Sequence, residues 1–101
     1  MIERHWKGIT NIENSDKYIK HLLEDTFPQL AKIEGFKKAS ILKREINDDV
    51  EFLIITRWQS LDAIQKFSGE NIENAVIPSM VKMMMKSYDL KVSHYEIKYE
   101  R

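Results

Sequence analysis

The chain has 101 residues, of which 43% are hydrophobic and 32% charged, with 16 Lys plus Arg against 16 Asp plus Glu and no cysteine. This is ordinary composition for one globular domain, residues 1–101, with little volume to spare for an enclosed cavity. A formal net charge of zero provides no long-range attraction to nucleic acid or to anionic membranes, and the lack of cysteine excludes disulfides, thiolate nucleophiles and cysteine-ligated metal sites.

The chain begins with a predicted strand and helix. Ile2 to Ile9 favours extended structure, and Asn14 or Ser15 is expected to cap the helix that follows, because a short polar side chain there accepts from an unpaired amide. An apolar stripe at helical spacing then faces the sheet. Pro28 lacks an N–H, so we expect a break or kink in the helix near Phe27 and a short turn through Leu30.

A hairpin is predicted in the middle of the chain. Gly35 ends the helical region, and Phe36 to Ile46 reads as a second strand. The turn residues Asn47-Asp48-Asp49 lead at once into a third strand, Glu51 to Trp58. Its run Phe52-Leu53-Ile54-Ile55 is apolar on both faces of the strand.

The last third predicts two helices and a strand. Ser60 caps a helix that Gly69 ends, and after an irregular stretch Pro78 precedes a short helix, Ser79 to Tyr88. Lys91 to Tyr99 reads as the last strand.

This order predicts an α+β, ferredoxin-like βαββαβ fold, with an antiparallel sheet whose helices lie on one face. Right-handed crossovers would put the first and third strands in the middle of the sheet. Two helices cover only one face, so a strand that is apolar on both sides implies a cover for the second, most simply another copy of the chain in a homodimer.

The three histidines differ in their expected surroundings. His21 falls on the polar side of the first helix and is expected at the solvated surface, and His5 at the surface or a rim. His94 lies mid-way along the last strand, where either a functional role or a hydrogen-bonded structural role fits.

Aromatic residues suggest a pocket. Trp6 follows Arg4 at strand spacing, and Trp58 ends the third strand on the side of Phe52 and Thr56. Core packing and dimer contact explain these side chains as well as a ligand pocket does. In the pocket interpretation, Arg4 supplies a charge for an acidic or phenolic oxygen. A charge on a central strand needs pairing, and Glu96 on the last strand is a candidate partner.

Met83 falls off the apolar stripe of the methionine-rich segment. It is a candidate for a pocket rim or the dimer contact, and an exposed methionine without a role is the alternative. No Gly-x-Ser-x-Gly motif and no phosphate-binding glycine loop is present, and no histidine or carboxylate pair has metal-site spacing. We expect no metal and no cofactor.

Several stretches resemble the antibiotic biosynthesis monooxygenase superfamily, whose members are dimeric α+β barrels. The resemblance covers nearly the whole chain, and the residues that carry it best are Glu51 to Ile64, which ends a strand in Trp-x-Ser, the closing His94 to Ile97, and Arg4-His5-Trp6-Lys7-Gly8. It implies a homodimer with a pocket for a flat small molecule.

The superfamily includes cofactor-independent monooxygenases of phenols and quinols, in which the deprotonated substrate itself reduces oxygen. By resemblance, this chain would oxidise a small aromatic, phenolic or quinol-type compound, with Arg4 or His94 holding or accepting the proton and Trp6 and Trp58 forming the walls. The haem-degrading branch of the superfamily typically has a histidine ligand in its second helical region and a tryptophan in the helix after the third strand. Ser60 to Tyr88 contains neither residue type, and Phe67 occupies the most plausible tryptophan position, so the resemblance does not favour haem degradation. The alternative is a non-catalytic, dimeric ligand-binding or stress-associated protein.

The location expected from the sequence is the cytoplasm. The first residues are charged, with no apolar segment behind them, and no apolar run approaches the ~20 residues that span a bilayer.

Overall fold

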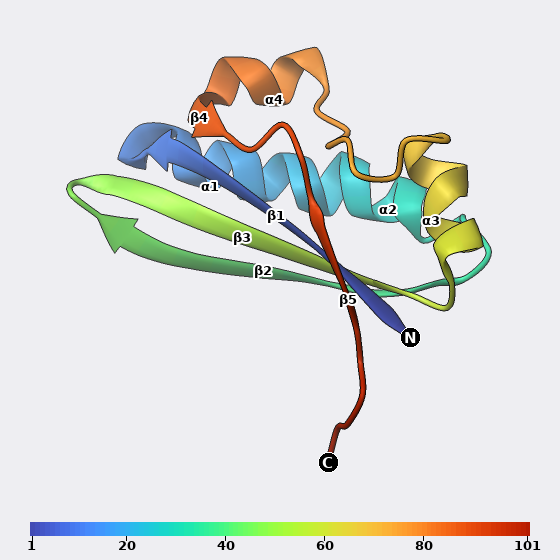
Figure 1. The fold of residues 1–101 in the computed structure, drawn as a ribbon. Helices are drawn as coiled ribbons and strands as arrows, with labels where there is room; N and C mark the ends of the chain where they lie inside the picture. The colour runs from blue at the N-terminus through green and yellow to red at the C-terminus, as the bar shows by residue number, and fades with distance from the viewer.

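Helices cover one face of a five-stranded antiparallel sheet in the computed structural model, which describes residues 1–101 (Figure 1). The sheet order is β2-β3-β1-β4, from β2 (Phe36–Ile46) and β3 (Asp49–Trp58) to β1 (Ile2–Asn11) and β4 (Met85–Tyr88), and β5 (Ser93–Glu96) also pairs with β1. The first and third strands are therefore central, as the crossover argument predicts, and the ferredoxin-like fold class is confirmed.

The hairpin of β2 and β3 is built on a two-residue turn. Asn47 and Asp48 both have positive φ, 49° and 68°, and Ile46 pairs directly with Asp49. Asn and Asp adopt this left-handed geometry more readily than most residues, and a turn of this twist matches the twist of paired strands. The third strand starts two residues earlier than predicted because the turn is this tight.

The first helical region is longer and more continuous than the sequence suggested. Its cap is Asn11, not Asn14 or Ser15, since β1 runs through Asn11 and the Asn11 side chain accepts from the amide of Asn14 at 2.8 Å. The helix α1 (Ile12–His21) then passes into a π-helical segment, η1 (Leu22–Thr26), and into α2 (Phe27–Leu30).

The helix does not break near Phe27, although it is irregular just before that residue. The amide of Phe27 bonds the carbonyl of Leu22, five residues back, so the helix widens by one residue per turn instead of ending. A π-turn shifts by one residue the pairing between amides and carbonyls of successive turns. The helix therefore continues through Pro28 although this residue has no N–H to donate.

His21 is less exposed than predicted. Its side chain is only 9% exposed and lies 3.9 Å from a carboxylate oxygen of Asp25. It follows Tyr18 by three residues and precedes the buried Leu22, so it borders the apolar stripe rather than the solvated side of the helix.

The C-terminal part departs from the predicted boundaries. After α3 (Leu61–Ser68), the helix α4 (Ser79–Met84) stops four residues early, and the next residues form β4. The predicted strand Lys91 to Tyr99 is regular only over β5. Between β4 and β5 the chain leaves β1 and pairs with the segment 73–75, where Ala75 donates to Leu90 and Val92 donates to Glu73. These main-chain bonds provide hydrogen-bond partners for backbone groups of the segment between β4 and β5, which lies outside the sheet.

The two faces of β3 differ sharply in how far a single chain buries their side chains. Phe52, Ile54 and Trp58 are buried under the helices, in two adjoining apolar clusters. Leu53 and Ile55 point to the other face, where they are half-buried, and their β2 neighbour Leu42 is 45% exposed. No helix covers that face (Figure 1). No helix in the chain is both long enough and apolar enough to cross a membrane.

Candidate functional site

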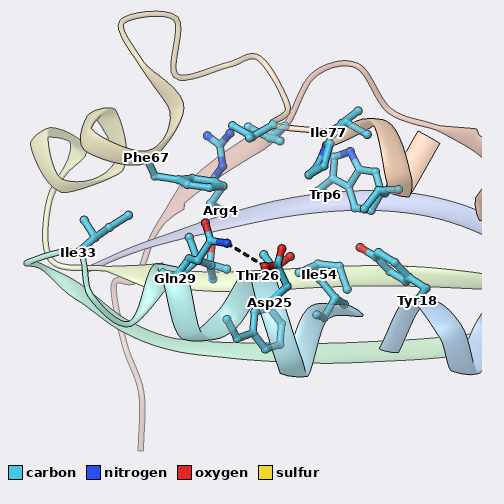
Figure 2. A pocket seen from close by; sticks show the side chains of 18 of the residues that line it. Arg4, Trp6, Tyr18, Asp25, Thr26, Gln29, Ile33, Ile54, Phe67 and Ile77 are labelled. Atoms are coloured by element: carbon cyan, nitrogen blue, oxygen red, sulfur yellow. Dashed lines mark hydrogen bonds between the residues drawn. The ribbon is translucent and has the colours of Figure 1, made fainter. Parts of the chain in front are cut away.

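A cavity of about 290 Å³ lies between the inner face of the sheet and the helices, and 12 of its 19 lining residues are hydrophobic. β1 and β3 supply its floor, η1 and α2 one wall, and Phe67 of α3 together with residues 76–78 the opposite wall (Figure 2). Its largely apolar lining with a few polar groups is typical of a small-molecule site.

Strand register arranges the floor in layers. Arg4 pairs with Thr56, and two residues along each strand Trp6 pairs with Ile54. Because alternate strand residues share a face, a polar pair and an apolar pair follow one another along the cavity. The next pair, Gly8 and Phe52, lies beyond the cavity lining.

Arg4 is the central polar group of the site. It is 4% exposed, and its guanidinium donates to the main-chain carbonyl of Ile72, to that of Asn74 at 2.8 Å and to the Nε2 atom of His94 at 2.9 Å. The carbonyls belong to the segment between α3 and α4, which Arg4 thereby ties to the sheet. Two of its five N–H donors have no partner in the chain.

The expected partner Glu96 is not bound to Arg4. Glu96 forms an exposed salt bridge with Lys98 at 2.8 Å, because its Cα lies opposite Ile2 at the end of β1. No carboxylate in the chain forms a salt bridge with Arg4. Burial lowers the pKa of Arg4 to about 10, so the group remains a cation at neutral pH. A buried cation without a counter-ion therefore lines an apolar cavity.

His94 contacts Arg4 but does not line the cavity. Since a guanidinium only donates, the Nε2 atom of His94 must be the acceptor and the ring is neutral. Burial, and then the charge of Arg4, lower the pKa of His94, against a weaker opposing effect of Glu73.

Stability should depend on the protonation of His94. Its pKa in the folded chain is below the ordinary 6.5, so the unfolded chain binds the proton more readily, and stability should fall as the pH drops through about 6.5 and below. In His94→Gln, whose side-chain oxygen still accepts from Arg4, this part of the decline should disappear. Urea unfolding from about pH 7.5 to about pH 5 measures it. Superimposable pH profiles would contradict the assignment.

Trp6 forms one end of the floor and depends on a glycine. Its Nε1 donates to the carbonyl of Asp89 at 2.8 Å, and its ring lies against Gly8. A Cβ on Gly8 would come within 2.7 Å of the Trp6 ring and 2.9 Å of the sulfur of Met85. Only glycine at this position lets the indole lie flat along the strand.

Thr56, Trp58 and Phe67 form a connected group beside Arg4. The Nε1 of Trp58 donates to the hydroxyl of Thr56 at 2.9 Å, so the hydroxyl proton of Thr56 is available for another acceptor. The ring of Phe67 stacks on Trp58 at 5.9 Å between centroids and lies 5.7 Å from the guanidinium carbon of Arg4.

The residues singled out from the sequence occupy different places. Arg4, Trp6, Thr56 and Phe67 line the cavity. The others do not line it: His94 contacts Arg4, Phe52 and Trp58 are fully buried in the core next to it, and Met83 is 84% exposed on α4.

Sequence reasoning missed the contribution of Tyr18. It belongs to the apolar stripe of α1 and is 2% exposed, with its ring edge-on to Phe52 at 4.9 Å and 6.2 Å from Trp6. Its hydroxyl points into the cavity (Figure 2). The signal available in the sequence was a tyrosine, not a phenylalanine, within a core stripe, since a buried hydroxyl normally needs a partner.

Solved structures with this fold span nearly the whole chain. A Bacillus cereus protein provisionally named an antibiotic biosynthesis monooxygenase superimposes with a TM-score of 0.70 at 16% identity, over 99% of this chain and 95% of its own. A Deinococcus radiodurans protein of the same provisional name gives 0.64 at 15% identity, over 100% and 96%. An arginine-to-serine mutant of MhuD with two manganese protoporphyrin IX molecules per active site gives 0.61 at 12% identity, over 100% and 98%.

Comparison of the sequence with family models and with curated proteins gives no match. At these identities the structural likeness establishes the shared α+β fold.

Proposed function

We propose that the chain is a cofactor-independent monooxygenase that binds a small aromatic anion, a phenolate or quinol-type compound, in the cavity above β1 and β3. The observation that carries this proposal is the buried, unpaired charge of Arg4 at the wall of an apolar cavity. The likeness of fold to proteins provisionally named monooxygenases supports the same class of reaction.

Arg4 and Thr56 would bind the anionic oxygen. The guanidinium has two free N–H donors and the Thr56 hydroxyl a free proton, and the two residues are cross-strand neighbours. In a site shielded from water, these donors lower the pKa of a bound phenol and favour the electron-rich anion that reacts with oxygen. Trp6, Ile54 and Phe67 would hold the ring.

The proposed reaction balances without a further reductant. A phenol loses its proton to water as it binds, the phenolate passes one electron to O₂, and a proton is taken up again when the O–O bond breaks. Recombination at the ring carbon para to the oxygen forms a C–O bond, and loss of the para hydrogen with cleavage of the O–O bond gives a quinone and one water. One O₂ is thus consumed for each phenol oxidised.

Oxygen uptake with polycyclic phenols and quinols tests the proposal. We expect enzyme-dependent uptake of one O₂ per quinone formed from a phenol, with turnover reduced at least about ten-fold in Arg4→Lys, since a hydrogen bond to a charged group contributes that much. The matched control is Arg44→Lys, an exposed arginine paired with Glu51 on the other face. Uptake equal to the uncatalysed rate, or an unaffected Arg4→Lys, would contradict catalysis at this site.

A second candidate is a non-catalytic ligand-binding protein with the same cavity. The observation in its favour is that His94, the proposed proton acceptor, does not line the cavity and gives its Nε2 lone pair to Arg4. Tight, Arg4-dependent binding of phenolates without oxygen uptake would support it.

A porphyrin does not fit this set of residues. His5 lies on the open face of the sheet in contact with Glu3 and Tyr95, His21 lies beside Asp25, and His94 is bound to Arg4. None of the three lines the cavity, so no histidine there is available to a haem iron.

We also propose that the open face of the sheet is covered by a second copy of the chain. Leu42, Leu53 and Ile55 form an apolar patch there, bordered by the charged cluster of Arg57 with Glu3 and Glu100. An apolar centre with a charged rim is the usual composition of a subunit interface.

Paired alanine substitutions on β3 test this assembly. Ile54→Ala removes a side chain that is buried within one chain and should cost about 2–5 kcal/mol in unfolding free energy. Leu53→Ala should cost a similar amount and weaken the dimer, because a second chain would bury Leu53 equally. Urea unfolding and sedimentation equilibrium measure both effects. A small loss for Leu53→Ala in a monomeric protein would rule the dimer out.

A further inference from the structure

The geometry points to a two-ended ligand: we infer that it carries a second oxygen, a hydroxyl or a carbonyl, on the side of its ring opposite the anionic group, and that Tyr18 recognises this second oxygen. The inference rests on the proposed function, because it assigns the other end of the same ligand. It adds Tyr18 as a residue that determines specificity.

The buried side chain of Tyr18 ends in a hydroxyl that lines the cavity and has no partner in the chain. The side chain is 2% exposed, and its hydroxyl points into the cavity (Figure 2). The ring is held on two sides by Phe52 and Trp6, so the hydroxyl has little freedom to turn elsewhere. Because the hydroxyl opens onto the cavity and to no polar group of the chain, its partner there is a ligand or water.

The opposite end of the cavity carries donors that suit an anion. There the free N–H groups of Arg4 and the hydroxyl proton of Thr56 converge, and these suit an anionic oxygen. Tyr18 differs because it carries no charge: burial raises its pKa, so the neutral hydroxyl both donates and accepts. It can therefore bind either a hydroxyl or a carbonyl.

The stretch between the two ends is apolar and suited to a flat ring. Trp6 and Ile54 occupy the layer of the floor between Arg4 and Tyr18 (Figure 2). No polar side chain of the floor interrupts this layer. A ligand that reaches both ends is thus an aromatic ring with one oxygen on each side, as in a para-quinol or a hydroxyaryl acid.

Pairs of aromatic acids with and without a distal hydroxyl test the inference. We would measure binding by calorimetry for benzoate and 4-hydroxybenzoate, and for biphenyl-4-carboxylate and its 4′-hydroxy derivative, which span two lengths. In the unmodified chain the hydroxyl should improve affinity about three- to ten-fold in at least one pair, the usual net effect of a neutral hydrogen bond.

Tyr18→Phe should abolish that gain while leaving binding of the unhydroxylated acids unchanged, because the ring that packs on Phe52 is retained. The control Tyr95→Phe, an exposed tyrosine on the open face, should retain the gain. No gain in either pair, or a gain that persists in Tyr18→Phe, would overturn the inference and leave Arg4-dependent binding intact. If none of the four acids binds the unmodified chain, the proposed ligand class itself is wrong.

Discussion

Replacing Trp58 with alanine should lower the free energy of unfolding by about 3–5 kcal/mol, the cost of removing a fully buried aromatic side chain from a packed core. The indole is completely inaccessible to solvent, stacks on Phe67 and meets Phe36 edge-on at 5.3 Å. It also donates its only N–H to Thr56. Three kinds of contact are therefore lost together, and urea unfolding followed by circular dichroism measures the loss.

The effect should extend to the site above it. Phe67 and Thr56 both line the cavity and both rest on Trp58, so ligand affinity should fall even at temperatures where the variant remains folded. The control is Leu61→Ala on α3, a side chain that is largely exposed, for which we expect a change within about 0.5 kcal/mol. Equal losses for the two variants would mean that Trp58 is not packed as described.

Replacing Arg4 with methionine should affect both stability and binding. Methionine fills similar space but leaves the carbonyls of Ile72 and Asn74 without their donors, and buried unsatisfied carbonyls cost about 1–3 kcal/mol each. We expect a loss of about 2–5 kcal/mol in unfolding free energy. Binding of aromatic anions should fall below detection, since the buried positive charge of the cavity floor is removed.

Hydrogen exchange distinguishes this local mechanism from a general loss of stability. In Arg4→Met, amides that bind the segment 73–75 to the detour between β4 and β5, such as Ala75 and Val92, should exchange faster relative to those of β3. Arg44→Met, which removes an exposed arginine, should change neither exchange nor stability. Uniform acceleration across the chain would show that Arg4 does not hold this segment in particular.

Local signals in the sequence predicted most of the fold, and their failures have identifiable causes. The turn at Asn47-Asp48 and the helix cap at Ser60 depend on the conformation and hydrogen bonds of neighbouring residues only. The sequence alone therefore predicts them. The helix does not break at Pro28 because a π-turn in the preceding residues absorbs the missing donor, and Leu22 and Leu30, on either side, stay buried.

The strand β4 and the short extent of β5 were also beyond the sequence, which predicted a helix through Tyr88. The last strand was predicted over Lys91 to Tyr99, but residues 90–92 find backbone partners in the segment 73–75 instead of in β1. Pairing between segments about 17 residues apart depends on which partner is free in the folded chain, which no local pattern encodes.

The sequence by itself determined the alternation that places Arg4, Trp6 and Thr56 on one face of neighbouring strands, because the period of a strand is two and the hairpin turn sets the register. Only the tertiary structure decided what those side chains meet. It gave the charge of Arg4 two carbonyls and a histidine instead of Glu96, left Met83 in solvent, and aimed the hydroxyl of a core tyrosine into the cavity. Those outcomes depend on contacts between residues distant in the chain, whose geometry emerges only when the sheet and helices pack together.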